Sequence, residues 1–225
     1  MLSLISPSRS NPLSNMAKYS GLYLLLLCFA LSLASKAEPA VTRDSSPTDF
    51  IKSSCRSTRY PALCVQCLSG YANAIRGSEH HLAQVALTVS LSQARSAAAF
   101  VSKLVKVRGL KPREYEAVKD CIDNMGDSVD RLGQSVKELG HMGGTVGQDF
   151  VWHMSNVQTW ASAALTDENT CLDGFGGRQM EGNVKTVIRN RIVNVARVTS
   201  NALALVNRFA ARHGAAAAAT EEPQG

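Results

Sequence analysis

The segment Pro112–Leu139, PREYEAVKDCIDNMGDSVDRLGQSVKEL, has the most regular hydrophobic pattern in the chain. Its apolar side chains recur at strictly alternating steps of three and four residues, at Tyr115, Val118, Ile122, Met125, Val129, Leu132, Val136 and Leu139. Eight positions in one register predict a long amphipathic helix with a narrow apolar seam, as in coiled coils and helix bundles. Pro112 stands in the first turn of this helix, where proline is tolerated.

Three further segments repeat the helical period, at residues 78–107, 146–165 and 182–212. Their predicted buried positions are Leu87, Leu91, Ala94, Ala98, Val101 and Val105, then Phe150, Met154, Val157, Ala161 and Ala164, and finally Ile188, Ile192, Val195, Thr199, Ala202, Val206 and Phe209. Four amphipathic helices with short connections predict an all-α, antiparallel up-and-down four-helix bundle over residues 78–212. The longest connection is a loop expected at about residues 166–177.

A helical hairpin is expected before the bundle, over residues 49–76. Its two apolar segments are joined by CRSTRYPALC, and Tyr60-Pro61 within it interrupts any continuous helix because the residue before a proline avoids the helical conformation. Hairpin and bundle together form a single domain, residues 49–213. An exposed leader, residues 38–48, is expected before it, and a disordered Ala-rich tail, residues 214–225, after it.

Residues 1–37 have the features of a secretory signal peptide, with translation starting at Met1 or Met16. Lys18 precedes an apolar run of 12 residues at positions 22–33, and small residues follow it. A membrane-spanning helix needs about 20 apolar residues, so this run is too short for an anchor. We therefore expect a secreted, extracellular protein that has no membrane attachment after signal cleavage.

Composition and charge exclude several functional classes. Aromatic residues make up only 6% of the chain, which disfavours an all-β fold. The 24 basic and 18 acidic side chains give a formal net charge of +6. The signal segment carries Arg9, Lys18 and Lys36 and no acid, so the mature chain has 21 basic and 18 acidic side chains and a net charge of +3. That charge is too small to predict nucleic-acid binding.

No motif predicts catalysis, a metal or a cofactor. Glu138–His141 is one copy of the Glu-x-x-His unit, of which di-iron bundles need two. The adjacent pair His80-His81 points to different sides of a helix and cannot share a metal ion. Cys64–Cys67 has the Cys-x-x-Cys spacing but lacks the strand-to-helix setting of a redox motif. These absences favour a binding protein.

Three acids, Asp167, Glu168 and Asp173, fall in the loop expected at residues 166–177. Acidic side chains in such loops commonly cap or charge the N-termini of helices. We therefore assign them no catalytic role. The spacing offers no acid/base couple among them.

The mature chain has an odd number of cysteines, Cys55, Cys64, Cys67, Cys121 and Cys171. In an oxidising compartment two bridges and one free thiol are the simplest arrangement. Five thiols allow fifteen ways of making two bridges. The cysteine count alone does not choose among them.

Several short motifs together resemble the plant invertase/pectin methylesterase inhibitor family. They are FIKSSC at 50–55, Tyr60-Pro61, KDC at 119–121, WASAALT at 160–166, TCLDGF at 170–175 and SNALAL at 200–205. The resemblance covers residues 50–209. It implies a Cys55–Cys64 bridge in the hairpin and a Cys121–Cys171 bridge in the bundle, which leaves Cys67 as a free thiol outside the family's four-cysteine pattern.

The resemblance implies an inhibitor that is not itself an enzyme. Family members bind plant pectin methylesterase in a reversible 1:1 complex that covers the pectin-binding cleft, and sibling proteins occlude acid invertases. The Pro-Lys-Phe tripeptide of invertase inhibitors is absent, and residues 191–205 resemble the esterase-directed branch. We expect a monomer whose partner is pectin methylesterase, with acid invertase as the alternative. A secreted bundle that binds another ligand or a cofactor is the alternative of a different class.

Polar side chains on the second and third bundle helices, and one in the loop that follows the third, are the expected partner contacts. They are Thr170, which matches a family threonine implicated in the esterase complex, with Asn156, Thr159, Asp130 and Gln134. Four histidines are candidates for a pH-dependent affinity, namely His80, His81, His141 and His153. No metal ligand is predicted among these residues.

Overall fold

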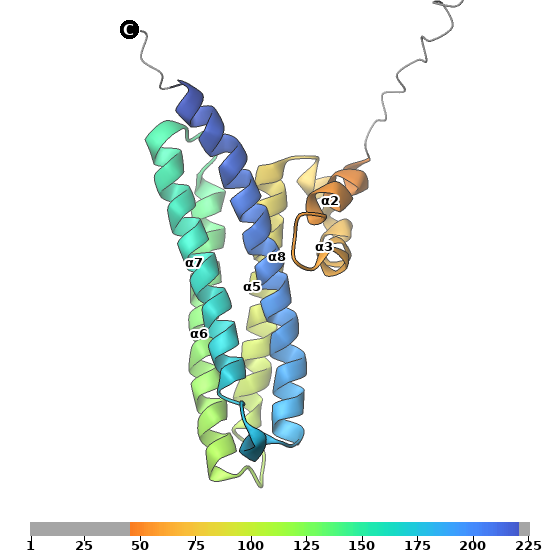
Figure 1. The fold of residues 1–225 in the computed structure, drawn as a ribbon, viewed down its shortest axis with the longest axis vertical. Coiled ribbons are helices and arrows are strands. Elements are labelled where there is room, and N and C mark those ends of the chain that lie inside the picture. The colour runs from red at the N-terminus through yellow and green to blue at the C-terminus, as the bar shows by residue number, and fades with distance from the viewer. Residues whose placement is uncertain (1–45, 221–225) are drawn as a thin grey trace, which may run out of the picture. The chain divides into compact units, whose positions relative to one another are not determined.

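The computed structural model describes residues 46–220, and all regular elements within that range are helices (Figure 1). In chain order they are α2 (Pro47–Cys55), α3 (Pro61–Leu68), the 3-10 turn η2 (Ser69–Tyr71), α4 (Ala72–Ile75), α5 (Glu79–Leu104), α6 (Pro112–His141), α7 (Gly147–Asp173), the 3-10 turn η3 (Arg178–Met180) and α8 (Asn183–Thr220). The expected signal peptide and residues 38–45 of the expected leader lie outside the described residues. Within the described part, no helix is long and apolar enough to cross a membrane.

Helices α5 to α8 form the expected antiparallel up-and-down bundle (Figure 1). Each packs against the next along the chain, and α8 returns to pack against α5. Every helix therefore has two neighbours around one shared core. That core contains nearly all the fully buried aliphatic side chains of α5 to α8, among them Leu87, Val118, Leu132, Val157 and Ile192.

The predicted seams are confirmed in α7 and α8, where every predicted position is buried. In α6 only every second predicted position is fully buried, at Val118, Met125, Leu132 and Leu139. The alternate positions are shifted by one residue, because Cys121, Ser128 and Ser135 are buried in place of Ile122, Val129 and Val136. Tyr115 is 38% exposed. The shift turns α6 toward α7, and the small side chains let the two helices approach closely.

Local sequence accounts for most helix ends. The Ser78 hydroxyl accepts a hydrogen bond from the His81 N–H (3.3 Å) at the start of α5. Gly109 adopts φ +87° between α5 and α6, a conformation that favours glycine. At the start of α6 the Lys111 N–H donates to Glu114 Oε2 (2.9 Å). His141 was expected in the Gly-rich break but is the last residue of α6, with its Nδ1 2.7 Å from the Lys137 carbonyl.

Two predicted helix ends are wrong. The loop expected at 166–177 begins only after Asp173. Residues 166–173 contain no glycine or proline, and the hydroxyls of Thr166 and Thr170 donate to carbonyls four residues back within the helix. Helix α8 continues to Thr220, into the tail expected to be disordered from residue 214. Alanine has the highest helix propensity, so the Ala run at 215–219 extends α8. Residues 221–225 lie outside the described part.

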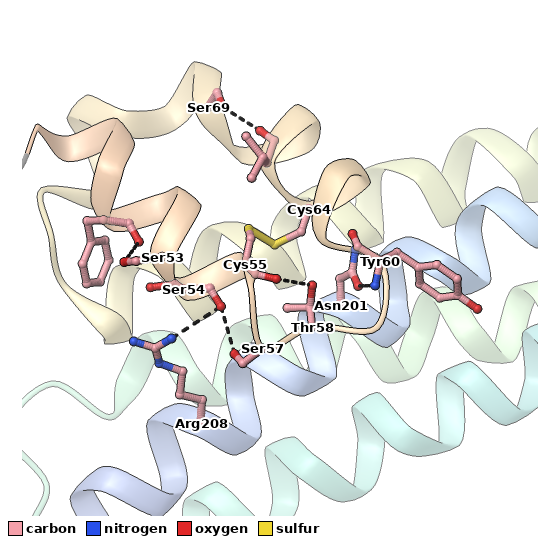
Figure 2. Close-up of a disulfide and its surroundings, with 12 residues drawn as sticks. Ser53, Ser54, Cys55, Ser57, Thr58, Tyr60, Cys64, Ser69, Asn201 and Arg208 are labelled. Carbon is pink, nitrogen blue, oxygen red and sulfur yellow. Dashed lines mark hydrogen bonds between the residues drawn. A yellow bond between two sulfur atoms is a disulfide. The ribbon is translucent and has the colours of Figure 1, made fainter.

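The hairpin of α2 and α3 packs on α8 and α5, and the Cys55–Cys64 disulfide joins its two helices (Figure 2). Asn201 of α8 pairs with both backbone groups of Tyr60: its Oδ1 accepts from the Tyr60 N–H (3.0 Å) and its Nδ2 donates to the Tyr60 carbonyl (2.9 Å). Arg208 Nη1 donates to the Ser54 carbonyl (3.4 Å). These contacts fix the hairpin loop against α8.

Candidate functional site

Helices α6 and α7 carry all the predicted partner contacts, and several interactions lock the two helices together. The Cys121–Cys171 disulfide joins them at one end, with a Cα–Cα distance of 4.3 Å. Further along, Arg131 Nε lies 2.8 Å from Asp167 Oδ2. The Ser135 hydroxyl donates to the Val157 carbonyl (3.3 Å). The pair is therefore braced at several levels along its length.

A cluster around Glu138 braces the other end of the pair. Its Oε1 lies 2.7 Å from His153 Nδ1 and accepts from Asn156 Nδ2 at 3.2 Å. The hydrogen bond from His153, together with that from Asn156, holds the pKa of Glu138 below its ordinary value against partial burial. Burial instead raises the pKa of Asp167, and the Arg131 guanidinium opposes that rise. Glu138 is thus the more strongly stabilised carboxylate of the two.

The predicted contact residues occupy the outer faces of the two helices. Asp130 and Gln134 are exposed one turn apart on α6, and Thr159 and Thr170 are exposed on α7. Asn156 is half-buried and donates a hydrogen bond to Glu138. The Thr170 hydroxyl donates to the Thr166 carbonyl (2.9 Å), so its oxygen lone pairs remain able to accept from a partner.

These residues form one long face rather than a pocket. The bond between Ser135 and Val157 places Gln134 near the level of Thr159 in the antiparallel pair. Thr170 lies 11 residues further along α7, about 16 Å at 1.5 Å per residue. A partner that contacts all of them must therefore cover an extended surface.

Trp152 was not among the predicted contact residues, and it is 62% exposed at the N-terminal end of α7. It lies one turn before Asn156, on the stripe that continues through Thr159 to Thr170 at steps of three and four residues. Its ring packs edge-on against His153, with ring centroids 4.9 Å apart. The signal was present in the sequence, because Trp152 falls outside the apolar seam of its helix. Exposed tryptophan is the side-chain type that most often anchors protein interfaces.

Glu168 lies in the bundle core and is 0% exposed, in contrast to the surface loop in which it was expected. Its Oε1 accepts hydrogen bonds from Ser128 of α6 (2.9 Å) and Thr199 of α8 (2.8 Å), and Thr199 lies 2.6 Å from the Ser90 hydroxyl of α5. Side chains from all four bundle helices thus belong to one buried hydrogen-bond network, with the Glu168 carboxyl bonded to two of them. Its other oxygen, Oε2, has no hydrogen-bond partner among the described residues. Glu168 was expected in a surface loop and is instead a core residue.

The remaining candidates are dispersed over the molecule. His80 Nε2 lies 2.9 Å from the Leu139 carbonyl, whereas His81 and His141 are exposed. Cys67 is a free, half-buried thiol, and Gln93 Nε2 lies 3.8 Å from its sulfur. Within residues 46–220, no group of three or more His, Cys, Asp or Glu side chains is placed to hold a metal ion.

Comparisons with known proteins identify the family of the chain. The family model described as plant invertase/pectin methylesterase inhibitor matches residues 49–205. Pectinesterase inhibitor 11 of Arabidopsis thaliana is 50% identical over 85% of this chain and 96% of its own length. Pectinesterase inhibitor 9 of the same plant is 55% identical over 83% of this chain and 93% of its own length.

The fold also matches a solved structure. A crystal structure of a mutant form of a pectin methylesterase inhibitor from Arabidopsis superposes with a TM-score of 0.55, at 20% identity over 68% of this chain and 92% of that one. At that identity the likeness supports the fold, while the family model and the two relatives support the ancestry. The chain belongs to the plant invertase/pectin methylesterase inhibitor family.

Proposed function

We propose that this protein is a secreted inhibitor of plant pectin methylesterase that binds the enzyme reversibly, one to one, and covers its pectin-binding cleft. The observation that carries the proposal is the 50–55% identity, over nearly their whole lengths, to two proteins named as pectinesterase inhibitors. The outer face of α6 and α7, defined by Trp152, Asn156, Thr159, Thr170, Asp130 and Gln134, is the proposed contact surface.

The mechanism is steric and needs no reactive group on the inhibitor. The disulfide, the Arg131–Asp167 contact and the Glu138 cluster hold the α6–α7 face in one conformation before the partner arrives. A preorganised surface loses little conformational entropy on binding, so more of the contact energy appears as affinity. Trp152 supplies the large apolar contact, and the threonine and amide groups supply hydrogen bonds to a polar cleft.

The acidic side chains on the outer side of α6 are expected to face a positively charged rim of the partner. Asp123, Asp127 and Asp130 are all exposed on the outer side of the helix. Carboxylates at the edge of an interface mainly speed association with a positively charged surface and make the rate depend on salt. We therefore expect association with the esterase to slow as ionic strength rises.

The direct test is a titration of the purified protein against a plant pectin methylesterase and, in parallel, against a cell-wall invertase. Stoichiometric inhibition of the esterase supports the proposal, and inhibition of invertase alone overturns it. An absorbance spectrum and metal analysis of the same preparation test the cofactor-binding alternative. Size-exclusion chromatography with light scattering tests the expected monomer and the one-to-one complex.

A further inference from the structure

A hollow of about 250 Å³ lies between α7, α8 and the loop that joins α2 to α3. Its polar lining consists of Arg59, Tyr60, Asn169, Arg197 and Ser200. Helical geometry separates it from the α6–α7 face, because adjacent residues of a helix point about 100° apart. Asn169 lines the hollow beside α8, whereas Thr170 belongs to the outer stripe. The hollow therefore lies on a different side of α7 from the outer stripe.

Two guanidinium groups of this hollow share one aromatic ring. The guanidinium carbon of Arg197 lies 5.4 Å from the centroid of the Tyr60 ring, and that of Arg59 lies 5.9 Å from it. No acidic residue lines the hollow, and within residues 46–220 neither arginine forms an ion pair. Two like charges gathered without a counter-charge repel each other, so an anion in the hollow lowers the electrostatic energy.

The loop that carries Tyr60 is held against α8 before any ligand binds. Both backbone groups of Tyr60 are hydrogen-bonded to the buried side chain of Asn201, at 3.0 and 2.9 Å. The Cys55–Cys64 disulfide closes the same loop, and the Tyr60 ring points away from it (Figure 2). A ligand therefore meets a loop whose backbone is already in place, with two guanidinium groups beside the Tyr60 ring.

The remaining groups select the kind of anion. Guanidinium groups bind carboxylates through pairs of parallel hydrogen bonds. Asn169 Nδ2 donates to the Leu165 carbonyl (2.8 Å), which leaves its Oδ1 free to accept. The Ser200 hydroxyl has no side-chain partner among the described residues and can donate or accept. A carboxylate beside several hydroxyl groups matches this set, and leucine and valine side chains provide an apolar wall for a sugar ring.

We propose that this hollow binds a uronic acid unit of de-esterified pectin, with the sugar carboxylate held between Arg59 and Arg197. The choice of a uronic acid over other carboxylates rests on the proposed function, since the esterase releases such carboxylates from methyl esters. The inhibitor then stays on pectin where the enzyme has already acted. The volume is below the 300–1,000 Å³ typical of drug-sized pockets, so the site holds a small part of the polymer.

The test is calorimetric titration of the purified protein, without any enzyme, with a de-esterified oligogalacturonate and with the same oligomer fully methyl-esterified. We expect the acidic oligomer to bind and the esterified one to bind at least about tenfold more weakly, because the ester carries no charge for the arginines. Arg197→Gln and Arg59→Gln are each expected to lower affinity for the acidic oligomer about tenfold. Arg95→Gln, at an exposed site on α5, removes the same charge elsewhere and is expected to change nothing.

Four outcomes overturn the proposal. Equal binding of both oligomers shows that the carboxylate is not recognised. An equal loss of affinity with Arg95→Gln shows non-specific attraction to a basic protein. No binding of the acidic oligomer refutes the site, while inhibition of the esterase in a separate assay leaves the proposed function intact. If the protein binds no acidic oligomer and Arg197→Gln weakens esterase inhibition, the hollow binds a carboxylate of the partner enzyme instead of the polysaccharide.

Discussion

The buried carboxyl of Glu168 makes the stability of the bundle depend on pH. Burial raises its pKa from the ordinary value of 4.5 to about 7, against the hydrogen bonds from Thr199 and Ser128, and the nearby charge of Asp167 adds to the rise. The folded protein therefore holds a proton that the unfolded chain releases more readily. The resulting stability is fully present below pH about 4.5 and is lost as pH rises through about 7.

The size of this effect follows from the two pKa values. One pKa unit corresponds to about 1.4 kcal/mol, so the difference between 4.5 and about 7 corresponds to about 3 kcal/mol. That is a large share of the roughly 5–15 kcal/mol by which domains are stable. Glu168→Gln keeps the oxygen that accepts from Ser128 and Thr199 but no longer titrates. The variant is therefore expected to lack this pH dependence.

The assay is urea unfolding followed by circular dichroism between pH about 4 and about 8. Over that range we expect the wild-type protein to lose about 3 kcal/mol of unfolding free energy more than Glu168→Gln does. Glu116→Gln, which changes an exposed glutamate of α6, is the matched control and is expected to follow the wild type. Parallel curves for wild type and Glu168→Gln, or a wild type that gains relative stability at high pH, would refute the reasoning.

Three further predictions concern the contact face and the hairpin. Cys121→Ser is expected to lower the free energy of unfolding by about 2–4 kcal/mol and to weaken esterase inhibition as well, because the disulfide closes a loop of 50 residues and ties α6 to α7; unchanged melting and inhibition would contradict this. Trp152→Ala is expected to weaken the esterase complex at least about thirtyfold, or about 2 kcal/mol, in a binding titration, while Tyr71→Ala, an exposed aromatic of the hairpin, leaves it unchanged. Asn201→Ala is expected to cost about 1–3 kcal/mol and to speed amide exchange of Tyr60, as measured by hydrogen–deuterium exchange; full protection in the variant would mean that other contacts hold the loop.

The spacing of apolar residues predicted the four bundle helices, because each seam spans enough turns to indicate both the length of the helix and its buried face. It failed at the C-terminal end of α7, where polar residues of TDENT were interpreted as a loop. Continuing the steps of four and three beyond Ala164 leads to Glu168 and then Cys171, and both are buried. A helix predicted from apolar residues alone ends too early when a buried position is occupied by a polar residue. A buried carboxyl with hydrogen-bond partners on two other helices cannot be recognised from the pattern of its own helix.

The contact face could be predicted from the sequence in part, whereas the hollow could not. Thr159 could be placed on the third predicted helix, whereas Thr170 fell in the expected loop and was singled out by the motif around Cys171. The hollow needed the structure, because Tyr60 and Arg197 are far apart in the chain and meet only when the hairpin docks on α8. Long-range contacts of this kind follow from tertiary packing, which a local period does not encode.

The polar network at Glu168 explains why so regular a bundle has one arrangement of helices. An Ala-rich core of small side chains packs almost equally well in several registers, since few of its contacts are specific in shape. Ser128 of α6 and Thr199 of α8 both donate to Glu168, and Ser90 of α5 joins the network through Thr199. Sliding α6, α7 or α8 by one turn would break at least one hydrogen bond to this buried carboxyl, and an unpaired buried polar group is costly. The network thus sets the register of α6 against α7, and that register aligns the two outer faces proposed to contact the esterase.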